Sequence, residues 1–129
     1  AWGELDGGLR DEEIIRVADY VRNLGGIAFD GDSKPRRWIQ GSAADGQRLF
    51  AAACARCHGE RGEGKEGPAL NNRVFLDLAT DTYLVKTIQN GRPGTSMAAF
   101  GTSSTVQGAL TESEIASVIT FLRTWEGKR

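Results

Sequence analysis

Apolar side chains recur at helical spacing in two segments of the chain, residues 11–24 and 112–125. In each segment, four apolar positions follow the i, i+3, i+4, i+7 spacing of one helix face. These positions are Ile14, Val17, Ala18 and Val21 in the first segment, and Ile115, Val118, Ile119 and Leu122 in the second. Thr111 and Glu114 fit a capping box at the start of the second segment. Both segments are therefore predicted to be amphipathic helices.

Two further segments, residues 43–54 and 81–90, have the composition and end signals of helices. The first is rich in alanine, the strongest helix former. The second follows Thr80, which can cap a helix start, and stops at Gly91. No segment shows the alternation of a half-buried strand with a turn partner. The pattern as a whole predicts an all-α protein.

The first and last helices also resemble each other in sequence. Residues 7–24 align without gaps on residues 108–125. The identical pairs are Gly7/Gly108, Leu9/Leu110, Glu13/Glu114, Ile14/Ile115, Val17/Val118 and Arg22/Arg123. Two interpretations stay open at this point. The segments are either a true internal repeat, or two amphipathic helices that share an acidic first turn by default.

Composition limits the class of protein but does not define its function. The 129 residues, 40% of them hydrophobic and 26% charged, are enough for one domain with a modest core, or for a small domain with an appendage. The formal net charge of −1 offers no electrostatic argument for binding nucleic acid or a membrane. No apolar run approaches the roughly 18 residues of a membrane helix. Residues 25–42 combine glycine, a proline and clustered charges without a period, and are predicted to be a linker.

The strongest chemical signal is C-A-R-C-H, residues 54–58, which contains both cysteines and the only histidine of the chain. C-x-x-C-H is the attachment signature of c-type haem. Thiols three positions apart can form thioether bonds with the two vinyl groups of one porphyrin, and His58 then lies where it can bind the iron. A zinc site or a redox dithiol stays open as an alternative. Zinc normally takes four ligands, however, and a dithiol of that kind normally accompanies a βαβ pattern.

A haem iron with one histidine needs a sixth ligand or an open face. Met97, in the sequence NGRPGTSMAAF, is the only methionine of the chain and lies between two predicted helices. A lone methionine usually fills a hydrophobic core. Since no second histidine exists and lysine ligation would require an unusually low pKa, we expect Met97 to be the distal ligand.

Residues 43–127 resemble the class I cytochromes c, small all-helical electron carriers. The resemblance depends on a helix with Gly46 and Phe50 that runs into C-A-R-C-H, on GPAL at 67–70 and on NGRPGTSM before a C-terminal helix. The order and spacing of these elements match the family throughout. One departure is Ala98, where many relatives have proline directly after the ligand methionine. The expected fold is a class I cytochrome c domain with an N-terminal helical extension.

The resemblance implies roles for individual residues. His58 is expected to bind iron and to form a hydrogen bond to the carbonyl of Pro68 through its other ring nitrogen. Gly46 and Phe50 are expected to meet Phe121 where the terminal helices cross. Arg73, Tyr83 and Arg92 are candidate partners of a haem propionate. The exposed haem edge is expected near Ala55, Arg56 and residues 98–100.

Taken together, the sequence predicts electron transfer by one haem c, bound covalently through Cys54 and Cys57 with His58 and Met97 as iron ligands and Pro68 supporting His58. No residue is placed for catalysis, so we expect an electron carrier rather than an enzyme. Alternatives are an electron-input domain of a larger oxidoreductase, or a haem-based ligand sensor. The expected partners are redox proteins, in a respiratory or other extracytoplasmic chain such as that of the periplasm.

The repeat gains a meaning from the same resemblance. AWG at residues 1–3 is similar to AFG at 99–101, directly after Met97, and LRDEEI at 9–14 is similar to the start of a class I C-terminal helix. Residues 1–24 are therefore expected to be the tail of a preceding cytochrome c domain, with a native N-terminal helical extension that packs on this one domain as the alternative. The linker 25–42 and the domain 43–129 follow. We expect the sequence, which does not begin with Met, to be part of a longer multihaem chain. A membrane tether in the missing part is compatible with this expectation.

Overall fold

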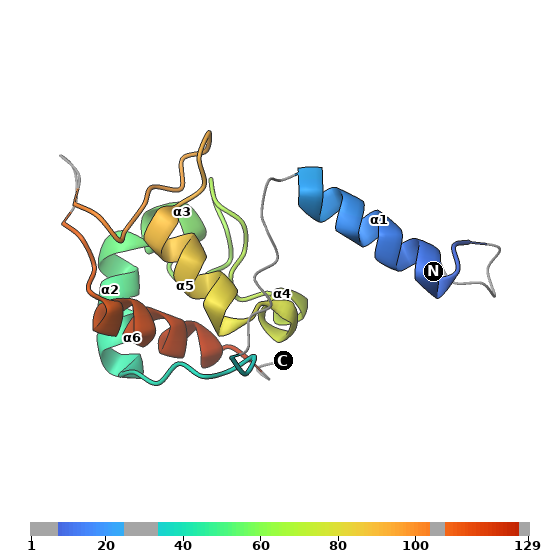
Figure 1. Ribbon diagram of the computed structural model, residues 1–129. Helices are drawn as coiled ribbons and strands as arrows, with labels where there is room; N and C mark the ends of the chain where they lie inside the picture. Colours follow the sequence, from blue (N-terminus) through green and yellow to red (C-terminus); the bar gives the residue numbers. More distant parts are fainter. Residues whose placement is uncertain (1–7, 25–33, 104–107, 127–129) are drawn as a thin grey trace. The chain divides into compact units, whose positions relative to one another are not determined.

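The computed structural model describes residues 8–24, 34–103 and 108–126, and divides the chain into two compact units, Ala1–Ser33 and Lys34–Arg129. All regular structure in the described residues is helical (Figure 1). The all-α prediction is therefore confirmed. The sequence similarity at residues 1–3 and the first part of the predicted linker, residues 25–33, lie outside the described residues.

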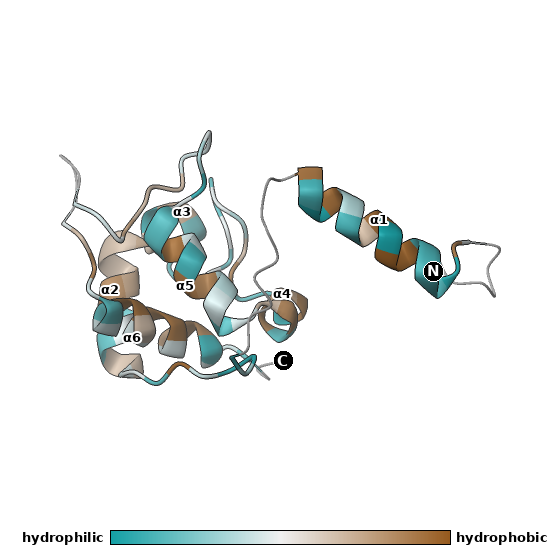
Figure 2. Cartoon of the chain, viewed as in Figure 1, coloured by the Kyte–Doolittle hydropathy of each residue, from teal (hydrophilic) through white to brown (hydrophobic). Residues whose placement is uncertain are grey.

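The first unit contains helix α1, Asp11–Leu24. Three acidic residues in its first turn and Arg22 in its last turn complement the helix dipole. Figure 2 shows hydrophobic and hydrophilic residues alternating along this helix. None of the helix residues is buried, and the large apolar side chains are exposed: Ile14, Ile15, Val17, Tyr20, Val21 and Leu24. The predicted apolar face is present, and it is not buried within its own unit.

In its described residues, the second unit contains five helices. They are α2 Ala43–Ala53, α3 Ala55–His58, α4 Arg73–Leu78, α5 Asp81–Asn90 and α6 Glu112–Arg123. The four predicted helices are all present, with α2 ending one residue and α6 two residues earlier than predicted. The short helices α3 and α4 were not predicted, because four to six residues are too few for a helical period to show. The caps at Thr80 and the capping box of Thr111 and Glu114 form as predicted.

Helices α2 and α6 cross at a point where the chain requires glycine. A Cβ atom on Gly46 would lie 1.9 Å from the carbonyl oxygen of Ser117 and 2.9 Å from Cβ of Phe121. Beside this point the Phe50 and Phe121 rings pack with centroids 5.5 Å apart. The predicted contact of Gly46 and Phe50 with Phe121 is therefore observed. Trp125 extends the aromatic group, 5.4 Å from the Phe50 ring.

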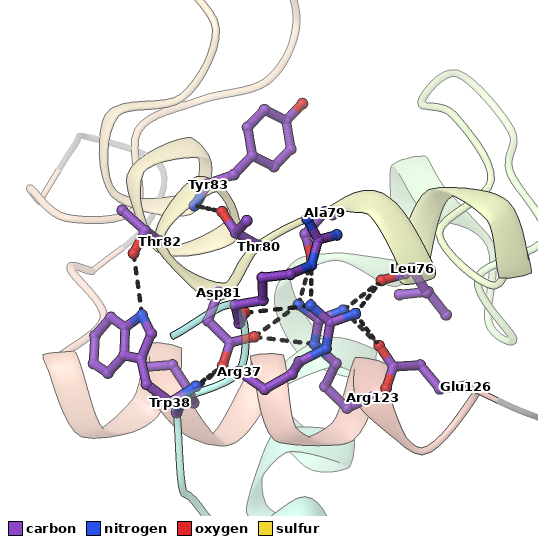
Figure 3. Close-up of polar contacts among 12 residues, drawn as sticks. Arg37, Trp38, Leu76, Ala79, Thr80, Asp81, Thr82, Tyr83, Arg123 and Glu126 are labelled. Carbon is purple, nitrogen blue, oxygen red and sulfur yellow. Dashed lines mark hydrogen bonds and ion pairs between the residues drawn. The ribbon is translucent and has the colours of Figure 1, made fainter. Parts of the chain in front are cut away.

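A buried carboxylate joins three distant parts of the second unit (Figure 3). Asp81, at the start of α5, is 2% exposed and accepts hydrogen bonds from the main-chain N–H groups of Trp38 at 2.7 Å and Ile39 at 2.8 Å. Arg123 of α6 donates to its other oxygen from Nε at 3.1 Å and Nη2 at 2.7 Å. Burial raises the pKa of Asp81, but the hydrogen bonds from Ile39, Arg123 and Trp38 outweigh that effect and lower the pKa overall.

Arginines also satisfy the carbonyl groups at the end of α4, where no further helical turn supplies N–H donors. Arg123 donates to the carbonyl oxygens of Leu76 at 2.8 Å and Ala79 at 2.7 Å. Arg37 donates to the same two oxygens at 2.7 and 2.9 Å, and to Glu126 at 2.9 Å. The described part of the predicted linker, residues 34–42, is thus hydrogen-bonded to α4 and α5 and belongs to the second unit.

Replacing Gly46 by alanine tests the helix crossing. The added methyl group must push α2 away from α6, so Gly46→Ala is expected to lower the free energy of unfolding by about 3 kcal/mol. Gln47→Ala, one residue along at an exposed position of α2, is the matched control and is expected to change stability by less than ~0.5 kcal/mol. Denaturant unfolding of both variants measures the difference. Equal stability of the two variants would contradict the crossing.

Asp81→Asn tests the buried carboxylate. It removes the buried one of the two carboxylates that pair with Arg123, so at neutral pH it is expected to cost about 3 kcal/mol. The folded-state pKa of Asp81 is lowered, so its contribution is complete above the unfolded pKa and is lost as the pH falls through the folded value. The stability difference from the parent protein should therefore shrink below about pH 4. Asp77→Asn, which removes an exposed ion pair with Arg73, is the control, and a difference of similar size at all pH values would contradict the assignment.

Candidate functional site

The C-A-R-C-H segment begins where α2 ends, because α2 stops at Cys54 and the chain turns directly into α3. The N–H groups of Cys57 and His58 both donate to the Cys54 carbonyl, at 3.1 and 3.0 Å. A spacing of three residues on one helical turn places the two thiols on the same side. Both are free and half-buried. Burial, with a smaller effect from Cys57, raises the pKa of the Cys54 thiol to about 11, so this thiol is protonated at neutral pH.

His58 is 8% exposed, and its ring is oriented by the chain that follows it. Its Nδ1 atom lies 2.9 Å from the carbonyl oxygen of Pro68, which is the predicted hydrogen bond. A carbonyl oxygen can only accept, so Nδ1 carries the proton and donates. In the neutral ring with this tautomer, Nε2 has the free lone pair that a metal ligand requires.

The loop between His58 and Pro68 fits closely around the imidazole ring. The N–H of Gly64 donates to the His58 carbonyl at 2.7 Å, and that of Gly67 donates to the Cys57 carbonyl at 2.8 Å. A Cβ atom on Gly67 would lie 2.8 Å from Cε1 and 2.9 Å from Nδ1 of His58. Gly67 was part of the quoted GPAL element, but its contact with the ring was not predicted. The sequence signal was the glycine itself, next to a proline ten residues after the histidine.

Met97 lies in the loop that follows α5 and packs, partly buried, against the hydrophobic core. The loop closes on itself through the Arg92 N–H, which donates to the Met97 carbonyl at 2.9 Å. Gly91, with φ +64°, lets the two ends approach: a Cβ atom there would lie 2.5 Å from the Met97 carbonyl oxygen. The sequence predicted the loop and its methionine, but not this closure.

The three candidate propionate partners, Arg73, Tyr83 and Arg92, all contact other side chains of the protein. Arg73 pairs with Asp77 of its own helix at 3.5 Å. The Arg92 guanidinium lies over the Tyr83 ring, 5.1 Å from its centroid, and donates to the Thr87 hydroxyl at 2.8 Å. Thr87 was not singled out in the sequence. The proposal that Arg73, Tyr83 or Arg92 binds a propionate stays a prediction.

The residues expected to border the haem edge differ in their own exposure. Arg56 and Ala98 are exposed, whereas Ala55 and Phe100 are buried at 7% and 8% exposure. The proposal that these residues border a haem edge stays a prediction. Ala55 is covered by the cluster around Phe50, and Phe100 by the cluster around Ile119.

The donor set fits a covalently attached haem. Two adjacent thiols, an imidazole with a free Nε2 and a thioether on a separate loop supply the two attachment points and two axial ligands that such a group needs. In the described part of the chain, no group of three or more His, Cys, Asp or Glu side chains is arranged to hold a metal ion. The zinc alternative therefore has no ligand set among these residues.

The helical arrangement and this donor set define a class I c-type cytochrome, and the comparisons with known proteins agree. The family described as cytochrome c oxidase, cbb3-type, subunit III matches residues 41–122. The chain belongs to this family.

Curated relatives match the chain over part of their own length. The cbb3-type cytochrome c oxidase subunit FixP of Bradyrhizobium sp. (strain ORS 278) is 40% identical over 69% of this chain and 29% of the relative. Subunit CcoP of Azospirillum sp. (strain B510) is 32% identical over 97% of this chain and 44% of the relative. The chain thus spans less than half the length of either protein.

Solved structures support the same fold. Cytochrome cL from Methylophaga aminisulfidivorans MPT is 32% identical, with a TM-score of 0.52 over 64% of this chain and 53% of that chain. The KustC0563 c-type cytochrome has a TM-score of 0.55 over 64% of this chain and 98% of that chain, and its 20% identity supports the fold alone. The matching family and the relatives above 25% identity are cytochromes c or cytochrome c oxidase subunits, so the predicted class of protein, a cytochrome c domain with haem c as its cofactor, is confirmed. None of the helices in the described residues is long and apolar enough to cross a membrane.

Gly67→Ala tests the fit of the loop around His58. The methyl group would overlap the imidazole ring, so the variant is expected to unfold about 2 kcal/mol more easily and to lose the slowly exchanging Nδ1 proton in its NMR spectrum. Gly108→Ala is the matched control, because a Cβ atom there meets nothing within 4 Å. If Gly67→Ala kept both the stability and the Nδ1 proton signal of the control, the close fit would be refuted.

Proposed function

We propose that this chain transfers electrons through one haem c, attached by thioether bonds at Cys54 and Cys57, with His58 and Met97 as axial ligands. The observation that supports the proposal most directly is the Nδ1–H bond of His58 to the Pro68 carbonyl, since it leaves Nε2 as the donor atom next to the two thiols. Haem supplies one-electron redox chemistry when bound.

The protein's part in this function is to hold its ligands still. The hydrogen bond to Pro68 strengthens His58 as a ligand and fixes its ring plane, and Gly67 closes against that ring. Met97 would offer a neutral, polarisable sulfur, which favours the reduced metal and would raise the reduction potential relative to ligation by two histidines. With His58 and Met97 both holding the iron, no external ligand would have to enter or leave, so reorganisation would be small.

We further propose that the chain is one part of a longer cytochrome, since its curated relatives extend well beyond the matched region. In this proposal α1 is the last helix of a preceding cytochrome c domain. The start of α1 supports this. The Arg10 N–H donates to the Glu13 carboxylate at 2.8 Å, just as the Thr111 N–H donates to Glu114 at 2.8 Å at the start of α6. Glu13 and Glu114 are identical positions of the sequence repeat. The exposed apolar face of α1 would then be covered by a helix of the preceding domain, as α6 is covered by α2.

The relatives suggest the setting. Subunits named for a cbb3-type oxidase imply a redox complex as partner, so the module would pass electrons to or from other subunits of a respiratory complex. Covalent haem attachment takes place outside the cytoplasmic membrane, so the domain is proposed to be periplasmic or otherwise extracytoplasmic, with any membrane tether outside this sequence. An electron-input domain of another oxidoreductase and a haem-based ligand sensor are not favoured by relatives that are c-type cytochromes.

The absorption spectrum of the dithionite-reduced holoprotein, before and after carbon monoxide, tests the ligation. A low-spin spectrum that carbon monoxide leaves unchanged over minutes is expected for the parent, and rapid adduct formation for Met97→Ala. Ser96→Ala, at the exposed neighbouring position, is the control and should behave as the parent does. Fast and complete adduct formation by the parent would reject Met97 as a ligand and favour the sensor.

A further inference from the structure

We infer that Arg92 is a positioning residue for Met97: its main chain closes the methionine loop and its guanidinium group fixes that loop to α5. The inference rests on the proposed ligation by Met97 and adds a residue to it. Three observations carry it, namely the internal hydrogen bonds of the loop, the attachment of its far end to α5, and the two contacts of the Arg92 side chain.

The loop from Arg92 to Met97 is held together by its own hydrogen bonds. Besides the bond from the Arg92 N–H to the Met97 carbonyl, the Arg92 carbonyl accepts from the Thr95 N–H at 3.1 Å and the Thr95 hydroxyl at 2.7 Å. The Thr95 hydroxyl in turn accepts from the Met97 N–H at 3.2 Å. These hydrogen bonds make residues 92–97 a compact loop, and the bond between Arg92 and Met97 joins its two ends.

Beyond Met97 the main chain is attached to α5. The N–H groups of Phe100 and Gly101 donate to the carbonyls of Ile88 and Gln89, both at 2.9 Å. This attachment fixes where the chain leaves the loop. These two bonds lie beyond Met97. Before Met97, the loop joins α5 at Gly91, the glycine with φ +64°, and a contact on this side would limit the tilt of the loop.

The Arg92 side chain supplies this contact. It reaches back along α5, donates to the Thr87 hydroxyl at 2.8 Å and lies over the Tyr83 ring with its Cζ 5.1 Å from the ring centroid. Thr87 and Tyr83 are one helical turn apart on one face of α5. A guanidinium group can form a directed hydrogen bond and stack on a ring at once because it is planar, which the ammonium group of lysine cannot match.

A neutral thioether is a weak ligand, so the fraction of protein in which Met97 binds the iron depends on how often the loop places its sulfur within reach. If the loop also adopted a second tilt, Met97 would be away from the iron in that fraction of the protein. An added ligand would then bind with a higher apparent affinity. The apparent affinity of the ferric protein for imidazole therefore measures how strongly the Arg92 contacts hold the methionine loop in place. A different role, in which Arg92 acts only through its positive charge on a haem propionate, predicts that any cation at this position suffices.

The experiment compares Arg92→Gln and Arg92→Lys with the parent holoprotein by imidazole titration of the ferric state, together with the far-red charge-transfer absorption of thioether-ligated ferric haem. Loss of one charged hydrogen bond and one stacking contact is expected to tighten imidazole binding about tenfold in both variants, and to weaken that absorption. Arg48→Gln, which removes an exposed arginine paired with Asp45 on α2, is the matched control and should bind imidazole as the parent does.

Thr87→Val and Tyr83→Leu test the two contacts one at a time and leave Arg92 itself in place. Each is expected to tighten imidazole binding about threefold, and neither should add to the effect of Arg92→Gln, because the contact is already lost in that variant. Parent affinity in Arg92→Lys, or full additivity in the double variants, would overturn the inference. If the parent protein itself lacked the far-red absorption, ligation by Met97 would be rejected. That result is distinct from one in which the parent has the absorption but the Arg92 variants do not differ from it.

Discussion

The close crossing of α2 and α6 at Gly46 is the constraint on which the rest of the domain depends. One of these helices runs directly into Cys54 and His58, so its position sets the imidazole side of the site. The other carries Arg123, which holds Asp81 at the start of α5, the helix that ends in the methionine loop. The positions of both halves of the site therefore depend on one pair of helices. A small change in how α2 and α6 cross would displace His58 and Met97 at the same time.

The sequence predicted those features whose stabilising interactions lie between residues close together in the chain. The longer helices were predictable because their apolar spacing, caps and terminal glycines all lie within a dozen residues of each other. The thiols and imidazole were predictable because one short motif contains them. The Asp81–Arg123 pair spans 42 residues, and nothing near either residue in the sequence marks the other. Short α3 and α4 depend on packing and capping by distant residues, so no period could reveal them.

The site shows the same division. The hydrogen bond between His58 and Pro68 was expected from resemblance to a family, and the geometry agrees. Arg92 was only a candidate partner of a haem propionate, and its guanidinium lies against Tyr83 and Thr87 of the preceding helix. An arginine next to a ligand loop invites an assignment based on charge alone. The planar shape of its side chain is known from the sequence, but the neighbours that it contacts are set by the fold.

The hydrogen bonds of residues 36–39 have a consequence for how this domain can be separated from its neighbours. An excision guided by the helical pattern alone would begin at residue 43 and discard Arg37 and the N–H groups that bind Asp81. It would leave a buried carboxylate with one charged partner, and main-chain carbonyls at the end of α4 with fewer donors. A domain that keeps these hydrogen bonds therefore has to begin at or before Arg36.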